Sequence, residues 1–191
     1  MTDSWERTRL DHRNRQADAI AGAALSLLLE HGAPALTMAA IATAADISRQ
    51  TLYRYFPDID AVLVGVAELV ASHDDDLEAH VRARPDPTAR LDTLLDAVAR
   101  AAGHHHSGTA TLRSTLPPAA RDVLTRHETR ITDLVAEILR DGIDGGIFGP
   151  DLEPVGDAPL VLGLAAAADP ADPERAITLI HRIVDRQETP T

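Results

Sequence analysis

Residues 37–56 read TMAAIATAADISRQTLYRYF, and this stretch decides the fold of the N-terminal part of the chain. Thr37 and Ser48 each precede a short segment with helical apolar spacing, and both residue types are typical helix N-caps. The pattern predicts a helix over about 38–44 and a second helix over about 48–55, joined by a tight turn. Two short helices joined in this way indicate a helix-turn-helix, whose second helix can enter the major groove of DNA.

The predicted second helix offers side chains that suit DNA. Arg49 and Gln50 lie at its N-terminus, where recognition helices reach base edges, and Arg pairs with guanine as Gln pairs with adenine. The hydroxyls and the second arginine can donate to phosphate oxygens, as can the free backbone N–H groups at the helix starts. The predicted DNA contacts are Thr37, Ser48, Arg49, Gln50, Thr51, Tyr53, Arg54 and Tyr55.

At these residues the sequence resembles the TetR family of one-component transcriptional regulators. The match covers about residues 13–70, a third of the chain. It is carried by Gly32, Thr37, Ile41-Ala42, Ile47-Ser48 and the string Thr51-Leu52-Tyr53-Arg54-Tyr55-Phe56. The resemblance implies an N-terminal three-helix DNA-binding domain, followed by a helical domain that binds a ligand and dimerises.

The chain departs from the family pattern at two positions. Asp46 stands in the turn where the family usually has Gly, and Asp tolerates left-handed backbone better than most residues. Ile59 stands where the family tends to place a phosphate-binding Lys, and it is flanked by Asp58 and Asp60. We expect the turn to be kept and this phosphate contact to be missing.

Composition excludes several classes of protein. The 191 residues include no cysteine, which rules out a disulfide framework, a thiolate metal site and a cysteine nucleophile. No apolar run approaches the ~18 residues that a membrane span needs. The first residues are polar and charged, unlike a secretory signal. We therefore expect a cytoplasmic protein with no membrane partner.

The acidic balance of the chain does not extend to its start. Acids outnumber bases 30 to 18, and every base is Arg. Over residues 1–56, however, six arginines balance six acids, and residues 57–191 hold 12 arginines against 24 acids. Averaged over the whole chain, the charge argues against nucleic acid binding. Its distribution leaves the predicted DNA-reading segment neutral, with residues 7–15 as a possible basic arm.

The remainder of the chain reads as helical. Ala is frequent, the apolar periodicity is that of helices, and no convincing strand is found. We predict an all-α fold of about nine helices, with a DNA-binding domain over residues 1–70 and a ligand-binding and dimerisation domain over 71–191. A break at residues 84–87 is the best candidate for a subdomain boundary.

Apolar stripes in the later helices suggest a pocket and an interface. A pocket between helices would be lined mainly by apolar side chains. The candidates are Leu95, Val98, Leu112, Leu116, Leu124, His127, Ile131 and Leu134, each of which can equally be ordinary core. The last two apolar segments suit a four-helix interface with a second copy. The candidates there are Leu160, Leu164, Ile177, Ile180 and Val184.

No metal, cofactor or catalytic site is expected. Consecutive histidines at 104–106 do not share a helix face, so one helix cannot direct all three at one ion. His127 reads as a core or pocket histidine, and Asp92 and Asp96 read as a solvated face. No GxSxG, phosphate loop, HExxH or dinucleotide motif is present, so an enzyme is not expected.

These features predict a homodimeric repressor that leaves a near-palindromic DNA operator when an unidentified small-molecule effector binds. The alternative is a helical ligand sensor or protein-interaction module that has lost DNA binding. The missing Lys and the acidic pair Asp58 and Asp60 motivate that alternative.

Overall fold

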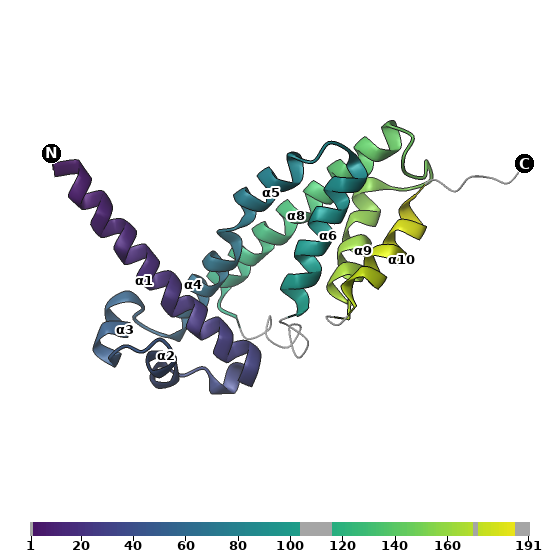
Figure 1. Cartoon of the computed structure of the whole chain (residues 1–191). Helices are drawn as coiled ribbons and strands as arrows, with labels where there is room; N and C mark the ends of the chain where they lie inside the picture. The colour runs from purple at the N-terminus through teal and green to yellow at the C-terminus, as the bar shows by residue number, and fades with distance from the viewer. Residues whose placement is uncertain (1, 104–115, 170–171, 186–191) are drawn as a thin grey trace, which may run out of the picture. The chain divides into compact units, whose positions relative to one another are not determined.

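The computed structural model describes residues 2–103, 116–169 and 172–185, and the regular elements of these residues are all helical (Figure 1). In chain order they are α1 Thr2–His31, the 3-10 turn η1 Ala33–Ala35, α2 Met38–Ala44, α3 Arg49–Tyr55, α4 Ile59–Ala71, α5 Asp74–Arg82, α6 Pro87–Gly103, α8 Pro118–Asp144, α9 Pro154–Ala166 and α10 Pro173–Val184. The all-α prediction is confirmed. No helix among the described residues combines the length and apolar character needed to cross a bilayer.

The chain divides into two compact units. The first unit takes in the described residues of 1–72 and 107–125, and the second those of 73–106 and 126–191. The functional division into residues 1–70 and 71–191 stays a prediction.

The core of the first unit forms where α1 packs along α4 and α2 packs against α1 and α3. Ile20, Ala24 and Leu28 recur at intervals of four, so they share one face of α1, and all three are buried. Gly32 follows this stripe with a φ of 74°, and its N–H donates to the carbonyl of Leu28 at 2.9 Å. This glycine with a positive φ therefore follows the end of α1, a common place for glycine. Trp5, near the start of α1, is 49% exposed.

The core of the second unit is built by α5, α6, α8, α9 and α10. Helix α8 runs on to Asp144, and the chain then turns at Gly146 with a φ of 67°. Phe148 follows this turn and is only 1% exposed, because its ring lies directly on Gly142. A Cβ at Gly142 would fall 2.0 Å from the Phe148 ring, so this packing requires glycine.

Ion pairs between helices surround the core of the second unit. Arg82 on α5 pairs with Glu137 on α8, and Arg130 on α8 pairs with Glu78 on α5 at 2.5 Å. These groups are partly exposed, and such pairs add little stability one by one. The pair of Asp74 and His127 differs from these because Asp74 is buried, with only 6% of it exposed. The Oδ1 atom of Asp74 lies 2.6 Å from Nδ1 of His127.

Candidate nucleic-acid interface

The turn between α2 and α3 adopts the conformation that the sequence predicts. The Thr37 hydroxyl accepts a hydrogen bond from the Ala40 N–H at 3.1 Å, which caps α2. Past the end of α2, Asp46 has a φ of 52° and is the one described non-glycine residue with a positive φ. The next N–H, of Ile47, donates back to the Ala42 carbonyl at 2.9 Å and closes the turn. Asp46 thus takes the left-handed position where the family has Gly.

Helix α3 is fixed at its start by Ser48. The Ser48 hydroxyl accepts from the Thr51 N–H at 3.1 Å and lies 2.9 Å from the Thr51 hydroxyl. Because α3 has only seven residues, such a cap satisfies a large share of its free N–H groups. The predicted caps at Thr37 and Ser48 are both confirmed.

One face of α3 is buried and the opposite face is exposed. Leu52 is fully buried in the core of the first unit. The outward stripe consists of two i, i+4 pairs, Arg49 with Tyr53 and Gln50 with Arg54, and all four residues are exposed. We call these four residues the α3 stripe. Its members are among the predicted DNA contacts.

The remaining predicted contacts on α3 lie beside the stripe. Thr51 and Tyr55 are partly buried, and Tyr55 packs against the core of the first unit. The Arg54 guanidinium lies 5.5 Å from the centroid of the Tyr55 ring, a cation–π arrangement that orders both side chains. The stripe and its flank therefore present hydroxyl, amide and guanidinium donors on a rigid support.

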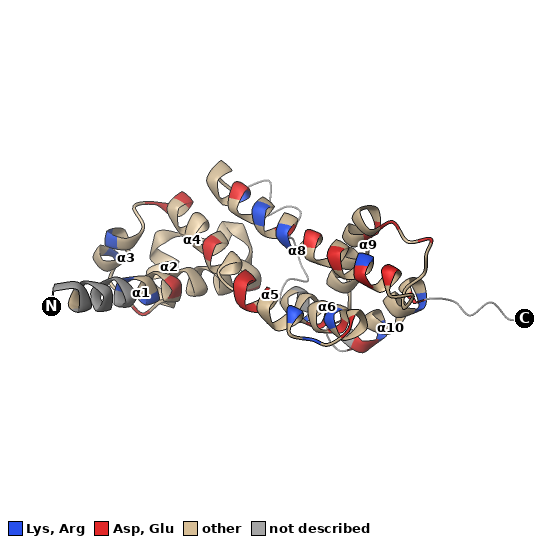
Figure 2. Cartoon of the chain, turned by 90° about the horizontal axis from the view of Figure 1, so that it is seen from above, with Lys and Arg blue, Asp and Glu red and all other residues tan. Residues whose placement is uncertain are grey.

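Charge around the motif is uneven. Helix α3 carries two arginines and no acid (Figure 2). Acids flank it on both sides: Asp46 is exposed in the preceding turn, Asp58 Oδ1 accepts from the Ala61 N–H at 2.8 Å as the N-cap of α4, and Asp60 is exposed. Ile59, at the position of the missing Lys, packs against the core of the first unit. The Asp58 carboxylate therefore caps α4, which a Lys or Arg side chain could not do because it has no hydrogen-bond acceptor.

The predicted pocket residues separate into two groups. Leu95, Val98, Ile131 and Leu134 lie in or against the core of the second unit. Leu116 lies in the core of the first unit and Leu124 packs against it, and Leu112 lies outside the described residues. His127 pairs with Asp74 rather than joining the apolar set. The pocket stays a prediction, and its coherent members are the four in the second unit.

The predicted interface residues differ in exposure. Leu160 is 64% exposed and Leu164 is also exposed, whereas Ile180 and Val184 are fully buried in the second unit and Ile177 is partly buried. The large apolar side chains that α9 and α10 expose are Val155, Leu160, Leu164, Leu179 and Ile183. We call these five residues the α9–α10 apolar face. Sequence reasoning missed Leu179 and Ile183 because α10 has apolar residues on two sides, and it also missed Val155 at the start of α9.

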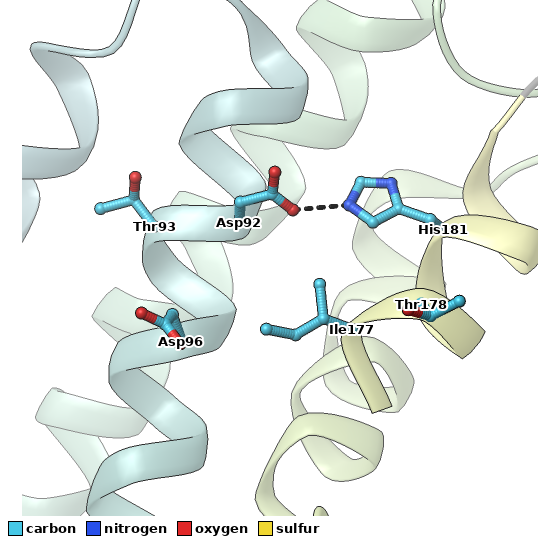
Figure 3. Close-up of a pocket in the computed structure, with 6 residues that line it drawn as sticks. All are labelled: Asp92, Thr93, Asp96, Ile177, Thr178 and His181. Atoms are coloured by element: carbon cyan, nitrogen blue, oxygen red, sulfur yellow. Dashed lines mark hydrogen bonds and ion pairs between the residues drawn. The ribbon is translucent and has the colours of Figure 1, made fainter. Parts of the chain in front are cut away.

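A second polar constellation lies between α6 and α10. Asp92, Thr93 and Asp96 of α6 and Ile177, Thr178 and His181 of α10 line an open cavity of about 390 Å³ (Figure 3). Asp92, read from the sequence as part of a solvated face, instead lies 2.6 Å from His181. The i, i+4 spacing of His181 and Asp185 was the one signal available in the sequence. The described residues hold no cluster of three metal-ligating side chains, and His104–His106 lie outside them.

The capped α2–turn–α3 unit and the exposed α3 stripe have the geometry of a DNA-binding helix-turn-helix. Residues 20–66 match the model of the bacterial regulatory proteins, tetR family. This segment, which contains α2, α3 and their support on α1 and α4, is a TetR-family N-terminal DNA-binding domain.

Solved structures of regulators share the fold of most of the chain. A TetR transcription regulator from Haloarcula marismortui is 21% identical with a TM-score of 0.72, covering 90% of this chain and 99% of its own. FadR from Bacillus subtilis in complex with stearoyl-CoA is 16% identical with a TM-score of 0.68, covering 85% and 96%. A protein from Saccharomonospora viridis described as a transcriptional regulator, in complex with choline, is 19% identical with a TM-score of 0.70, covering 92% and 100%. No curated protein matches the sequence.

Proposed function

We propose that this protein is a homodimeric repressor that binds a near-palindromic operator and releases it when a small molecule binds. The observation that carries the proposal is the α3 stripe, which points four donor-bearing side chains outward from a capped helix. Arg49 and Gln50 are the proposed base readers, because they lie in the first turn of the recognition helix. The proposed site of action is the cytoplasm, where operator DNA lies.

Phosphate contacts are assigned to the side chains around the stripe. Tyr53, Arg54 and Tyr55 donate to phosphates, and the helix starts at Thr37 and Ser48 offer hydroxyl and N–H groups. The Thr51 hydroxyl, held beside that of Ser48 at 2.9 Å, is ordered for a phosphate oxygen or a thymine methyl. These contacts position the helix, and base contacts supply sequence preference.

The second copy is assigned to the α9–α10 apolar face. Val155, Leu160 and Leu179 are each about half exposed or more, and burial of such side chains favours association. A dimer places two α3 helices in successive major grooves, about 34 Å apart, and the operator then repeats its half-site with two-fold symmetry.

Effector binding is assigned to the core of the second unit around Leu95, Val98, Ile131 and Leu134. A ligand that favours one conformer shifts the population toward it and so changes DNA affinity. The regulators with stearoyl-CoA and with choline hold chemically unlike molecules. The effector class therefore has to be found by screening, for which a thermal-shift assay of small apolar compounds is suited.

A mobility-shift assay on the DNA flanking the protein's own gene tests the proposal. We expect a saturable, sequence-dependent shift at low salt and a steep loss of affinity as salt rises. The absence of such a shift at low salt contradicts repression through this segment.

The second candidate function is a ligand sensor or interaction module without DNA binding. Asp58 and Asp60 at the start of α4 favour it, because they place negative charge where the family has a phosphate contact. This candidate predicts weak DNA binding with little salt dependence. A steep slope of log K against log salt would reject it.

A further inference from the structure

His181 lies between two carboxylates that come from different elements. Its Nε2 is 2.6 Å from Oδ1 of Asp92 on α6, and its Nδ1 is 3.2 Å from Oδ1 of Asp185, which follows the last turn of α10 (Figure 3). The imidazole is thus a polar link between α10 and α6, and the cavity beside it gives protons access from solvent.

The two hydrogen bonds define the protonation state in which this link is complete. An ionised carboxylate only accepts hydrogen bonds, and a neutral imidazole has one N–H donor. With His181 neutral, one ring nitrogen must therefore turn a lone pair toward a carboxylate oxygen. Both contacts are favourable only in the imidazolium form, in which both nitrogens donate.

The charged groups around His181 reinforce this preference. On α6 these are Asp92 and Asp96, and Asp96 also pairs with exposed Arg100. Just past the end of α10, the facing acid is Asp185. Helix α9, which also packs on α6 and α10, contributes no residue to the cavity, and its one acid, Asp157, accepts from the Glu153 N–H at 2.8 Å. The described surroundings of the imidazole are therefore mainly acidic.

The balance of physical causes agrees with the hydrogen-bond geometry. Partial burial by itself lowers the pKa of His181, but the hydrogen bonds and charges of Asp92 and Asp185 together outweigh it. The pKa of His181 consequently lies above its usual value. The protonated link persists over a wider pH range than an isolated histidine would allow.

We propose that His181 is a pH-dependent clamp that fastens α10 to α6 when protonated and releases it when neutral. Leu179 and Ile183 lie on the opposite side of α10 from His181 and belong to the α9–α10 apolar face. The clamp therefore determines how well the α9–α10 apolar face is ordered. Under the proposed function, this face receives the second copy. Rising pH loosens that surface and weakens subunit association.

The wild-type chain provides the first test. We expect NMR titration of the His181 ring in the full-length protein to give a pKa above the ordinary value of about 6.5. Hydrogen exchange of α10 amides, corrected for the intrinsic pH dependence, reports detachment of the helix. We expect the protection of the α10 amides against exchange to fall between pH 6 and pH 9. The fall should be about tenfold for each pH unit by which the pKa of His181 exceeds the ordinary histidine value.

Matched variants separate the clamp from general effects of pH. In His181→Gln the protection of α10 should no longer change with the titration, whereas His80→Gln, at an exposed histidine of α5, should behave as wild type. Asp92→Asn keeps an oxygen acceptor but removes the charge. It should lower the ring pKa and reduce the pH dependence, while Asp133→Asn, at an exposed residue of α8, should not. Asp92→Asn also serves if His181→Gln fails to fold.

Two results would overturn the clamp. One is a ring pKa at or below the ordinary histidine value, and the other is the same pH dependence of α10 protection in the His181→Gln chain as in wild type. Sedimentation between pH 6 and pH 9 tests the consequence for association separately. If α10 protection follows His181 but association does not, the clamp stands and the assigned interface between copies is wrong.

Discussion

Oδ1 of Asp74, the one buried charged group among the described residues, lies 2.6 Å from Nδ1 of His127 across α5 and α8. His127→Ala leaves this carboxylate buried without that partner, and we expect a loss of about 2–3 kcal/mol in the free energy of unfolding. Urea unfolding followed by circular dichroism measures it. The double variant with Asp74→Ala should lose less than the sum of the single losses, and additive losses would argue against a direct pair.

Base readout should depend on Gln50 and Arg49. Either residue changed to Ala should alter the sequence preference of the operator by ~1–3 kcal/mol at one base, because a bidentate contact is lost. Tyr55→Phe should instead weaken binding about equally on all sequences, because it removes a phosphate contact. Binding-site selection from a random library distinguishes the two outcomes. Arg140→Ala, at an exposed arginine of α8, is the control, and an unchanged preference in Gln50→Ala contradicts its assignment.

The two acids at the start of α4 should have separable effects. Asp58→Ala removes the cap on the Ala61 N–H and should cost about 1 kcal/mol of stability, whereas Asp58→Asn retains a capping oxygen and should cost less. Asp60→Lys should strengthen DNA binding and steepen the log K against log salt slope by about one, because it adds one phosphate contact. Fluorescence anisotropy over a salt series checks the slope. A slope equal to wild type would indicate that this position does not face DNA.

The left-handed turn residue gives a test of backbone strain. Asp46→Gly relieves the cost of a φ of 52° and should leave the protein equally or more stable. Asp46→Val places a β-branched residue in that conformation and should lose about 1–3 kcal/mol. Thermal unfolding of the two variants compares them directly. Equal melting temperatures would mean that the turn can rearrange.

Association should fail when charge is placed on the α9–α10 apolar face. Leu160→Glu, at a side chain that is 64% exposed, and Ile183→Glu should each yield folded monomers, because a dimer would have to bury the new carboxylate. Analytical ultracentrifugation measures the oligomeric state, and circular dichroism checks that the helices persist. Ile147→Glu, at an exposed apolar residue outside this face, is the matched control. Unchanged sedimentation of the first two variants would exclude this face as the interface.

Local patterns predicted the caps and the turn of the helix-turn-helix. Thr37 and Ser48 cap α2 and α3, and Asp46 forms the turn, because each depends on neighbours within three or four positions. Contacts between distant positions escaped prediction. His181 and Asp92 are 89 residues apart, and only packing of α10 on α6 joins them. The same packing decides that Val184 is buried and Ile183 is exposed, which apolar periodicity on a two-sided helix cannot decide.

The distribution of aromatic side chains gives each unit a different optical signature. The one tryptophan, Trp5, is in α1, and both tyrosines, Tyr53 and Tyr55, are in α3, so all three belong to the first unit. In the second unit the only aromatic chromophores other than histidine are provided by Phe148. Intrinsic fluorescence therefore follows the first unit alone, without an attached dye, while far-ultraviolet dichroism follows the helices of both units. If the fluorescence and dichroism transitions occur at different denaturant concentrations, the two units unfold separately.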